Sequence, residues 1–297
     1  MAKDMNKEAF DDGTKLKLDI FGECFEEWLP VFGNDLYTKE IYVFDFFAGS
    51  GSDKNGINGS PLILLSNTKS YCQKLKKPVK FIFNEIEDDK VQLLKDNIDK
   101  VIQQCVSEND CSECVLQRNV VQHEFKELFN QKKVQDVLED NKIGKFILLD
   151  QYGFKHVNDN IFRQLINYPK TDFIFFISSS NIRRFKKHNS VKKYIETDKV
   201  NFNETKPKEC HRAMAGYFKT LVDKEYYIHH FTIKKGANYW GLIFGSNHTL
   251  GMEKFLKVCW KHDPFSGDAN YNIDGNVEED DLFYIPGNNV KKDGSSH

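Results

Sequence analysis

Residues 41–51 read IYVFDFFAGSG, an apolar run that ends in an acidic residue and a turn with two glycines. The first four residues are β-branched or aromatic and have no helical period, so they predict a central strand that is buried on both faces. Asp45 to Gly51 then match the pattern D-x-x-x-G-x-G. Glycines at positions 49 and 51 allow positive φ angles and a close approach of a ligand to the backbone. The segment therefore predicts a strand that leads into a cofactor-binding turn.

Other interpretations of this turn use glycines in the same way. An ordinary strand-to-helix turn, a dinucleotide fold and a P-loop each place glycine after a strand. The sequence has no G-x-G-x-x-G at this point, and no G-K-[ST] follows. A pyrophosphate site is therefore disfavoured.

The composition is that of a globular protein without an overall nucleic-acid-binding charge. The chain has 297 residues, of which 40% are hydrophobic and 29% are charged, and its net charge is −2. Any nucleic-acid binding would therefore depend on local basic patches. The charged N-terminus lacks the apolar region of a signal peptide, and no run approaches the ~18 apolar residues of a membrane span. We expect a cytoplasmic protein, and the final GSSH resembles the remnant of an expression tag.

Three of the seven cysteines form a cluster, Cys105, Cys111 and Cys114. Their spacing could hold a metal, but a structural zinc site takes four ligands, and only His123 stands near enough to be the fourth. An odd number of cysteines without a secretion signal favours reduced thiols. We therefore expect a surface loop with reduced thiols here, and we assign no metal to the functional site.

Apolar strands alternate with helical segments along most of the chain. Strands are predicted at 41–44, 79–83, 119–123, 145–149 and 172–177, and helices at 14–29, from Ser60-Pro61 onward, 88–104, 134–142 and 158–167. Ser60 is a candidate N-cap, and Pro30 is expected to end the first helix. A helix at 211–223 precedes two consecutive strands, 225–234 and 239–246, and a last helix spans 250–262. This order predicts an α/β fold with a Rossmann-like, doubly wound, mostly parallel seven-stranded sheet and an antiparallel C-terminal hairpin.

Acidic residues follow four of the predicted strands. They are Asp45, Glu85, Glu124 and Asp150. The carboxyl ends of parallel strands meet at one edge of such a sheet, which is where its ligands bind. One acid at this position is normal for a solvated loop, whereas four predict a polar ligand with hydroxyl and amino groups.

These motifs resemble those of the class I S-adenosylmethionine-dependent methyltransferases. DFFAGSG is similar to their first motif, FIFNE to the second strand with its ribose-binding acid, HEF to the adenine-contacting end of the third strand, and LLDQYGF to motif IV. The resemblance implies S-adenosylmethionine as the cofactor. The glycine turn would lie against its methionine and ribose, Glu85 would accept hydrogen bonds from the ribose hydroxyls, and Asp45 would contact the ammonium group or orient the loop. The implied cofactor-binding residues are Asp45, Phe47, Ala48, Gly49, Gly51, Glu85, Glu124 and Phe125, the last two at the adenine.

A narrower resemblance is to the three-Cys-motif partner protein (TcmP) family, bacterial proteins of this fold. It is carried by TKLKLDIFGECFEEWL, by DFFAGSG followed by GSPLIL, by DQYGF and by YWGLIFGSNHTLGMEKFLKVCWK. The cysteines in the family's name belong to a radical-SAM-like partner protein, so the resemblance implies such a partner and gives no role to Cys105, Cys111 and Cys114. We expect a methyltransferase-like domain over 1–262, with an insertion at 181–210, and an acidic polar tail over 263–297.

The motif IV likeness assigns the catalytic residues. Asp150 stands where an amino-methyltransferase places the first acid of D-P-P-Y, which hydrogen-bonds the target amine. Gln151 and Tyr152 replace the two prolines, and the aromatic residue is Phe154. This departure argues against transfer to an exocyclic amine, although Asp150 with Tyr152 or Phe154 could hold a planar acceptor.

The predicted insertion begins with a basic run. Its cations, among them Arg183, Arg184, Lys186 and Lys187, alternate with Phe185 and Tyr194. Cations for phosphates and rings for bases are typical of single-strand binding, while a solvated helix face is the other interpretation. His229 and His230 lie in the middle of a predicted strand, where we expect structural histidines with their hydrogen bonds satisfied.

The leading hypothesis is a methyltransferase that acts on nucleic acid. The alternative is a non-catalytic or cofactor-sensing partner subunit of a radical-SAM-like three-Cys-motif protein. A nuclease is the third hypothesis, because Asp45, Glu85 and Asp150 could in principle hold magnesium.

Overall fold

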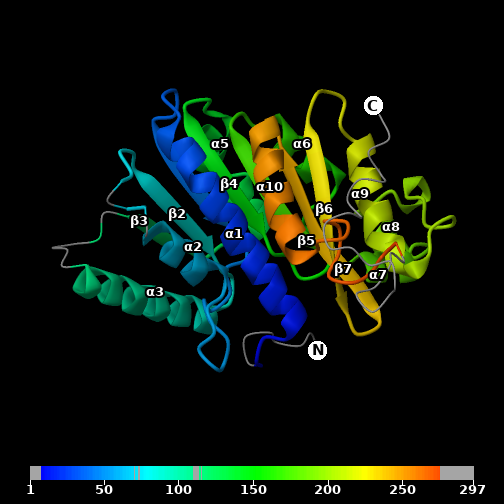
Figure 1. Cartoon of the computed structure of the whole chain (residues 1–297), viewed down its shortest axis with the longest axis horizontal. Coiled ribbons are helices and arrows are strands. Elements are labelled where there is room, and N and C mark those ends of the chain that lie inside the picture. Colours follow the sequence, from blue (N-terminus) through cyan, green and yellow to red (C-terminus); the bar gives the residue numbers. More distant parts are fainter. Residues whose placement is uncertain (1–7, 70, 73, 110–113, 115, 275–297) are drawn as a thin grey trace.

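A computed structural model describes residues 8–69, 71–72, 74–109, 114 and 116–274 of the chain. Its centre is a seven-stranded sheet with the order β3-β2-β1-β4-β5-β7-β6 (Figure 1). The strands are β1 (Glu40–Asp45), β2 (Val79–Asn84), β3 (Gln117–Val121), β4 (Ile143–Leu149), β5 (Thr171–Ile177), β6 (Tyr227–Lys235) and β7 (Asn238–Ser246). β1 to β5 run parallel, and β7 is antiparallel to both β5 and β6. The predicted fold class is confirmed, including the antiparallel C-terminal hairpin.

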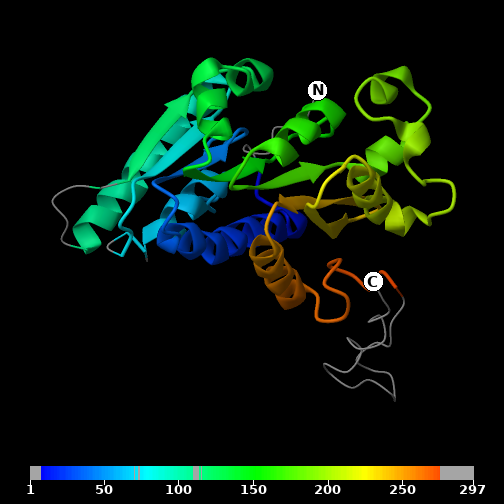
Figure 2. The same cartoon turned by 90° about the horizontal axis from the view of Figure 1, so that it is seen from above.

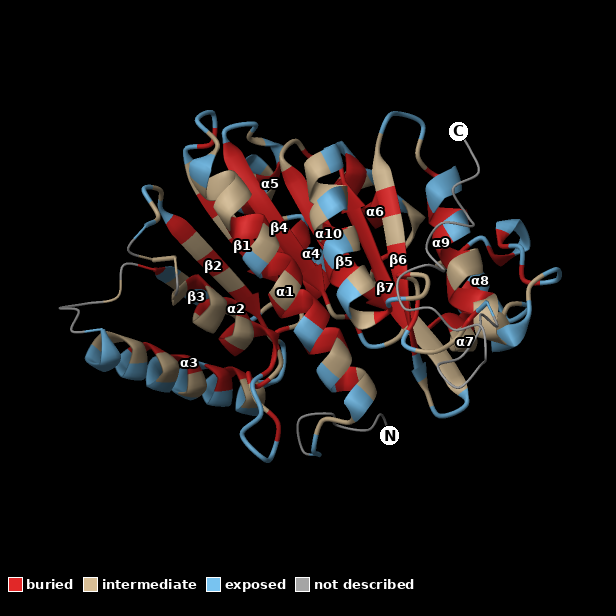
Figure 3. Ribbon diagram, viewed as in Figure 1, coloured by how far each residue is buried: buried red, intermediate tan, exposed pale blue. Residues whose placement is uncertain are grey.

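Helices cover both faces of the sheet (Figure 2). One face carries α1 (Asp12–Asn34), α2 (Ser60–Lys69), α3 (Asp88–Glu108) and α10 (Thr249–His262). The other carries α4 (Phe125–Phe129), α5 (Lys132–Glu139), α6 (Asp159–Asn167) and α9 (Cys210–Thr220). The buried residues therefore form two layers, one on each side of the strands, and the solvent-facing sides of the helices are exposed (Figure 3). Strands β4 and β5 are buried along their whole length, as expected for central strands of a doubly wound sheet.

The first helix runs past Pro30, which was predicted to end it. α1 continues to Asn34 with Pro30 inside it. Proline removes one backbone hydrogen bond from a helix interior. Packing around this position offsets that loss, because Phe32 stacks on the buried Trp28 with 4.6 Å between ring centroids. Tertiary contacts thus override the local stop signal.

Ser60 has a different role from the predicted N-cap. α2 begins at Ser60, and the serine hydroxyl donates a hydrogen bond of 2.6 Å to the Asp45 carboxylate. An N-cap side chain instead accepts from a backbone N–H at the start of the helix. The side chain therefore links α2 to the end of β1.

The segment predicted as an insertion over one face belongs to the core. It folds into two short helices, α7 (Ser179–Arg184) and α8 (Asn189–Lys192), and two 3-10 turns. Its apolar side chains join the core layer of α6 and α9; these are Ile182, Val191, Ile195, Val200 and Phe202. These residues follow no single helical period because the segment contains only short helices and turns, which is why its sequence pattern predicted an insertion over one face.

Residues 263–274 pack on the edge strand β6. The Thr232 N–H donates to the Asp268 carbonyl, and the Asn270 N–H donates to the Thr232 carbonyl at 3.1 Å. Ala269 and Ile273 are buried. These residues therefore form part of the folded body, and the predicted polar tail stays a prediction for 275–297, which lie outside the described residues.

Two further expectations concern the described part of the chain only. Within it, no helix combines the length and the apolar character that crossing a membrane needs. Its six cysteines form no disulfide with one another. Cys111 lies outside the described residues, so the predicted cysteine cluster stays untested.

Candidate active site

A cavity of about 530 Å³ opens at the carboxyl ends of β1 to β4. Loops after these four strands form most of its wall, and the first turns of α1 close one side. Nine of the residues predicted for the site line this cavity: Phe47, Ala48, Gly49, Gly51, Glu85, Glu124, Phe125, Asp150 and Tyr152. The structure therefore brings the predicted strand-end residues together, with the exception of Asp45 and Phe154, which do not line the cavity.

The glycine turn after β1 has the backbone conformation that its sequence predicts. Gly49 has φ of 62° and Gly51 has φ of 82°. A Cβ on Gly51 would also lie 3.0 Å from the Leu94 side chain. The Asn97 amide holds the turn from α3 by donating to the Ser50 carbonyl at 2.9 Å. Glycine is therefore required at position 51 for its conformation and for space.

Asp45 lies beneath the turn and is completely buried. Its carboxylate accepts hydrogen bonds from the Ser60 hydroxyl at 2.6 Å and from the Phe47 N–H at 3.2 Å. Burial raises the pKa of Asp45 to about 7, and the Asp150 carboxylate acts in the same direction, against the two hydrogen bonds and the Lys17 ammonium. Of the two roles predicted for Asp45, the geometry fits orientation of the loop.

The raised pKa of Asp45 makes stability depend on pH. The folded state holds this proton up to a pKa of about 7, whereas the unfolded chain releases it near the ordinary aspartate pKa of 3.8. The folded state thus binds more protons in this window, and the contribution of Asp45 to the free energy of unfolding falls as the pH rises from about 4 to about 7. We expect Asp45→Asn, which stays neutral, to be more stable than the wild type at pH 8 by on the order of 3 kcal/mol.

Urea denaturation of both proteins at pH 5 and pH 8 measures this effect. Asp53→Asn is the control for a nearby aspartate, because its carboxylate accepts backbone hydrogen bonds and its pKa is lowered. If the free energies of unfolding of the wild type and Asp45→Asn differ by the same amount at both pH values, Asp45 is ionised in the folded state.

Glu85 is held in place by the backbone that follows β2. Its Oε1 accepts from the N–H groups of Ile86 at 2.7 Å and Glu87 at 2.9 Å. The side chain is half-buried and lies on the cavity wall next to Ile86, an apolar residue that is 56% exposed. A preoriented carboxylate beside an exposed apolar side chain can accept hydrogen bonds from a ligand's hydroxyl groups and contact its ring.

Three aromatic rings pack against one another further along the same wall, and we call them the ring cluster. Phe47 lies 5.0 Å from His156 and 5.3 Å from Phe125, and Phe125 lies 5.5 Å from His156, measured between ring centroids. All three line the cavity. Burial lowers the pKa of His156, so its imidazole is neutral near pH 7. The side of this cluster that faces the cavity offers an uncharged aromatic surface to a flat ring.

His156 is a site residue that the sequence analysis missed. It lies in the loop after β4, where the buried Gln151 accepts hydrogen bonds from the N–H groups of His156 and Val157 at 2.9 and 3.2 Å. No motif marks this histidine, because the loop's own hydrogen bonds bring it back toward β1. Gln151, which replaces a proline of D-P-P-Y, is thus the residue that shapes the loop.

Glu124 has a structural role that the prediction did not include. It caps α4, and its Oε2 accepts from the N–H groups of Lys126 at 2.6 Å and Glu127 at 3.3 Å. Its side chain lies at the cavity. One carboxylate oxygen is therefore committed to the helix.

Asp150 forms an ion pair with Lys17 of α1. The Lys17 ammonium lies 2.5 Å from Asp150 Oδ2 and 4.8 Å from the centroid of the Phe176 ring. Lys17 is only 7% exposed, and the Asp150 side chain is 18% exposed. Both line the cavity. The sequence placed Lys17 on an amphipathic helix without connecting it to the site.

The two aromatic residues after Asp150 point in different directions. Tyr152 is 67% exposed and lines the cavity. Gly153 has φ of 96°, and beyond it Phe154 contacts Tyr194 edge to face at 6.4 Å. Tyr152 is therefore accessible at the mouth of the cavity, whereas Phe154 packs toward α8.

The basic run begins beside the cavity and is partly engaged within the protein. Ser178 and Asn181 line the cavity at the start of α7. Arg184 follows Asn181 by one helical turn and donates to the Asn238 side chain at 3.2 Å, whereas Lys186 donates to Asn203 at 2.5 Å. Lys187 is exposed, and Arg183 is half-buried. Arg184 and Lys187 are thus the members of the predicted set that present charge to solvent.

The magnesium site of the nuclease hypothesis is not formed. The described residues contain one group of at least three side chains whose ligand atoms lie close enough to share a metal. Asp45, Glu85 and Asp150 do not belong to this group. Asp45 is instead sealed below the turn by Ser60.

Several solved structures are similar to this chain. One is a complex of Trm1 from Pyrococcus horikoshii with S-adenosyl-L-methionine, with 10% identity over 84% of this chain and 59% of that chain and a TM-score of 0.44. Another is an O-methyltransferase from Bacillus cereus with SAH, with 12% identity over 75% and 79% of the chains and a TM-score of 0.41. A third is the plantazolicin methyltransferase BpumL with SAH, with 9% identity over 79% and 86% and a TM-score of 0.40. The chain therefore spans 59% of the length of Trm1.

No family model matches the chain, and the search of curated proteins found no match. The resemblance to the three-Cys-motif partner proteins stays a prediction. The fold assignment rests on the observed strand order and directions, a parallel sheet of β1 to β5 with an antiparallel hairpin of β6 and β7.

Proposed function

We propose that this protein is an S-adenosylmethionine-dependent methyltransferase that acts on nucleic acid. The observation that carries the proposal is the order of features along one cavity wall. The glycine turn follows β1, the oriented Glu85 carboxylate follows β2, and the ring cluster joins the loops after β1, β3 and β4. A nucleoside joined to an amino acid needs these three environments in this order.

The residues fit the cofactor group by group. The turn at Gly49 and Gly51, which lines the cavity with positive φ angles, would lie against the methionine part. Glu85 would accept hydrogen bonds from the ribose hydroxyls, and the ring cluster of Phe47, Phe125 and His156 would contact the adenine from one side. A volume of about 530 Å³ falls within the usual range of small-molecule sites and leaves space for part of an acceptor.

The cofactor supplies a methyl group on a sulfonium, and the chain must place an acceptor in line with it. Asp150 and Tyr152 lie at the cavity beyond the cofactor residues and can position the acceptor by a charged hydrogen bond and ring contact. Lys17 holds the Asp150 carboxylate in one orientation. Asp150 is therefore the catalytic residue of this proposal, and Lys17 is its positioning residue.

Nucleic acid is the proposed acceptor because a basic run follows Asn181, which lines the cavity. Arg184 and Lys187 of this run are exposed, and Phe185, which is 51% exposed, lies between them in the sequence. Phosphates would contact the cations, and an unpaired base would reach Tyr152. Single-stranded regions fit this arrangement because their bases are free to enter a cavity.

The acceptor is tested with labelled S-adenosylmethionine and a panel of tRNA, single-stranded RNA, single-stranded DNA and duplex DNA. We expect label to enter a single-stranded acceptor. The double variant Arg184→Glu/Lys187→Glu is expected to bind this acceptor at least about tenfold more weakly and to lower the salt slope of binding by about 2.

The matched control is Lys95→Glu/Lys100→Glu, which changes the net charge equally on the exposed side of α3. It is expected to bind like the wild type. Equal losses of nucleic-acid affinity in both double variants would show that binding depends only on the net charge of the protein. The basic segment would then have no place in the proposed interface.

A cofactor-sensing partner subunit is the second candidate, and one contact favours it. Lys17 already occupies the Asp150 carboxylate, so the acid that would meet an acceptor is neutralised from within the chain. On this interpretation the protein binds S-adenosylmethionine, transfers no label to any acceptor and associates with a three-Cys-motif partner protein. Copurification with such a partner and the transfer assay separate the two candidates.

A further inference from the structure

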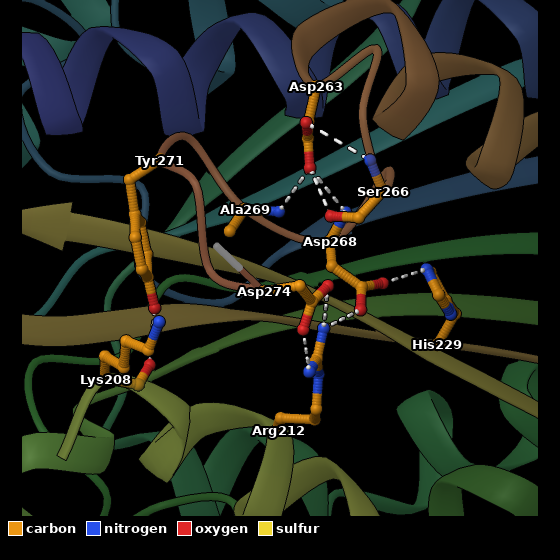
Figure 4. A network of polar contacts seen from close by, with 9 residues as sticks. All are labelled: Lys208, Arg212, His229, Asp263, Ser266, Asp268, Ala269, Tyr271 and Asp274. Atoms are coloured by element: carbon orange, nitrogen blue, oxygen red, sulfur yellow. Dashed lines mark hydrogen bonds and ion pairs between the residues drawn. The ribbon is translucent and has the colours of Figure 1, made fainter. Parts of the chain in front are cut away.

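The edge strand β6 is covered by the segment 263–274, which a polar network holds in place (Figure 4). Asp263 organises the turn by accepting from the Ser266 hydroxyl at 2.6 Å and the Ala269 N–H at 3.2 Å. Asp268 stands in the middle of this network, between Arg212 of α9 and His229 of β6. The segment thus brings a carboxylate to a pair of strand histidines.

The two histidines do not have the satisfied hydrogen bonds that the sequence analysis expected. His230 is 5% exposed, and neither of its ring nitrogens has a hydrogen-bond partner in the described part of the chain. The Nε2 of His229 also lacks a hydrogen bond there, and it lies 3.5 Å from Asp268 Oδ1. An unpartnered polar group in the interior costs free energy unless something else binds it.

We propose that His229, His230 and Asp268 bind a divalent transition-metal ion such as Zn²⁺. One ring nitrogen of each histidine and one carboxylate oxygen lie within 4.8 Å of one another. Ligands at zinc distances stand about 3.0–3.4 Å apart, so small side-chain rotations bring the three atoms to one ion. Two imidazoles and a carboxylate favour zinc, iron, cobalt or nickel over the oxygen-binding ions magnesium and calcium.

The burial of the three side chains leaves the site partly open to solvent. Three protein ligands leave a further position to water, which can reach the site because the side chains of His229 and Asp268 are 20% and 17% exposed.

The surroundings also fix the third ligand in the required orientation. The Arg212 Nη2 lies 2.7 Å from Asp268 Oδ2, which leaves Oδ1 directed at His229. Arg212 is itself paired with Asp274 at 2.7 Å. Residues that hydrogen-bond to a metal ligand in this way orient the ligand and tune the affinity of the site for the metal. No other side chain in the network competes for Oδ1 among the residues described.

The proposed ion would tie the C-terminal segment to the sheet. Without that segment, β6 would present an unpaired edge to solvent. The site lies apart from the active-site cavity, whose lining includes Ile233 and Lys235 of β6 but neither histidine. The inference therefore stands independently of the proposed methyltransferase function.

The test is a titration of the metal-free, full-length protein, prepared without a polyhistidine tag, with Co²⁺ and then Zn²⁺. We expect one equivalent of Co²⁺ to give the visible absorption of nitrogen and oxygen coordination, and one equivalent of Zn²⁺ to remove it. His229→Gln and Asp268→Asn are each expected to weaken Zn²⁺ binding at least about tenfold, and Arg212→Gln about tenfold to 100-fold through Asp268.

The control is His248→Gln, since His248 is an exposed histidine outside the cluster. It is expected to bind Zn²⁺ like the wild type. The proposal is overturned if the wild type takes up no stoichiometric Co²⁺ or Zn²⁺. It is also overturned if His229→Gln and Asp268→Asn both bind as tightly as the wild type. The wild-type spectrum decides the matter if a variant does not fold.

Discussion

Asp150→Asn is expected to lower the rate of methyl transfer by about 100-fold or more and to leave S-adenosylmethionine binding within about threefold. Asparagine keeps the shape of the side chain but removes the negative charge that would bind and orient the acceptor. Asp150 directly follows β4 and lines the cavity together with Glu85 and the ring cluster. Single-turnover transfer from labelled S-adenosylmethionine measures the rate, and calorimetry measures the binding.

Asp136→Asn provides the control for this substitution, because Asp136 is exposed on α5 and does not line the cavity. It should transfer at the wild-type rate. Wild-type transfer by Asp150→Asn would remove Asp150 from the reaction. Loss of cofactor binding in that variant would move Asp150 from the acceptor side to the cofactor side.

The ion pair between Lys17 and Asp150 is also expected to contribute strongly to the stability of the fold. Lys17→Met is expected to lower the free energy of unfolding by about 3 kcal/mol, because it leaves the largely buried Asp150 carboxylate without its cation. Adding Asp150→Asn should restore most of this stability, since the uncompensated charge is then gone. The double-mutant cycle, measured by urea denaturation at pH 7, gives the coupling between the two side chains.

Lys15→Met serves as the reference on the same helix. Lys15 is exposed and lies 3.6 Å from Asp12, so its loss should change stability by less than about 0.5 kcal/mol. Additive effects of Lys17→Met and Asp150→Asn would show that the two side chains do not depend on each other. Lys17 would then have no positioning role.

Features set by local sequence were predictable. The runs that became β1, β2, β4 and β5 are apolar, β-branched or aromatic, and residues with this pattern form buried strands in most contexts. The acidic residues after the strands lie close together because the carboxyl ends of parallel strands lie at the same edge of the sheet. Glu85 and Asp150 could therefore be placed at a common site from the sequence alone.

Contacts between segments that lie far apart in the sequence were not predictable. Lys17 precedes Asp150 by 133 positions, and nothing in a helix of mixed polarity indicates which lysine turns inward. His156 reaches the ring cluster only because Gln151 holds the loop after β4. His230 meets Asp268 because the chain beyond α10 folds back along β6. Each depends on a contact between distant segments, which short-range patterns do not contain.

The proposed function requires that the cavity bind S-adenosylmethionine through Glu85. Calorimetry of the wild type and of Glu85→Gln tests it, because glutamine can keep the hydrogen bonds to the N–H groups of Ile86 and Glu87 while it removes the charge. We expect micromolar binding by the wild type, about −8 kcal/mol, and about tenfold weaker binding by Glu85→Gln. The control Asp89→Asn, an exposed acid at the start of α3 that does not line the cavity, should bind like the wild type. Absence of binding by the wild type would show that the cavity is not a site for S-adenosylmethionine, and equal binding by Glu85→Gln would show that Glu85 does not hold this cofactor.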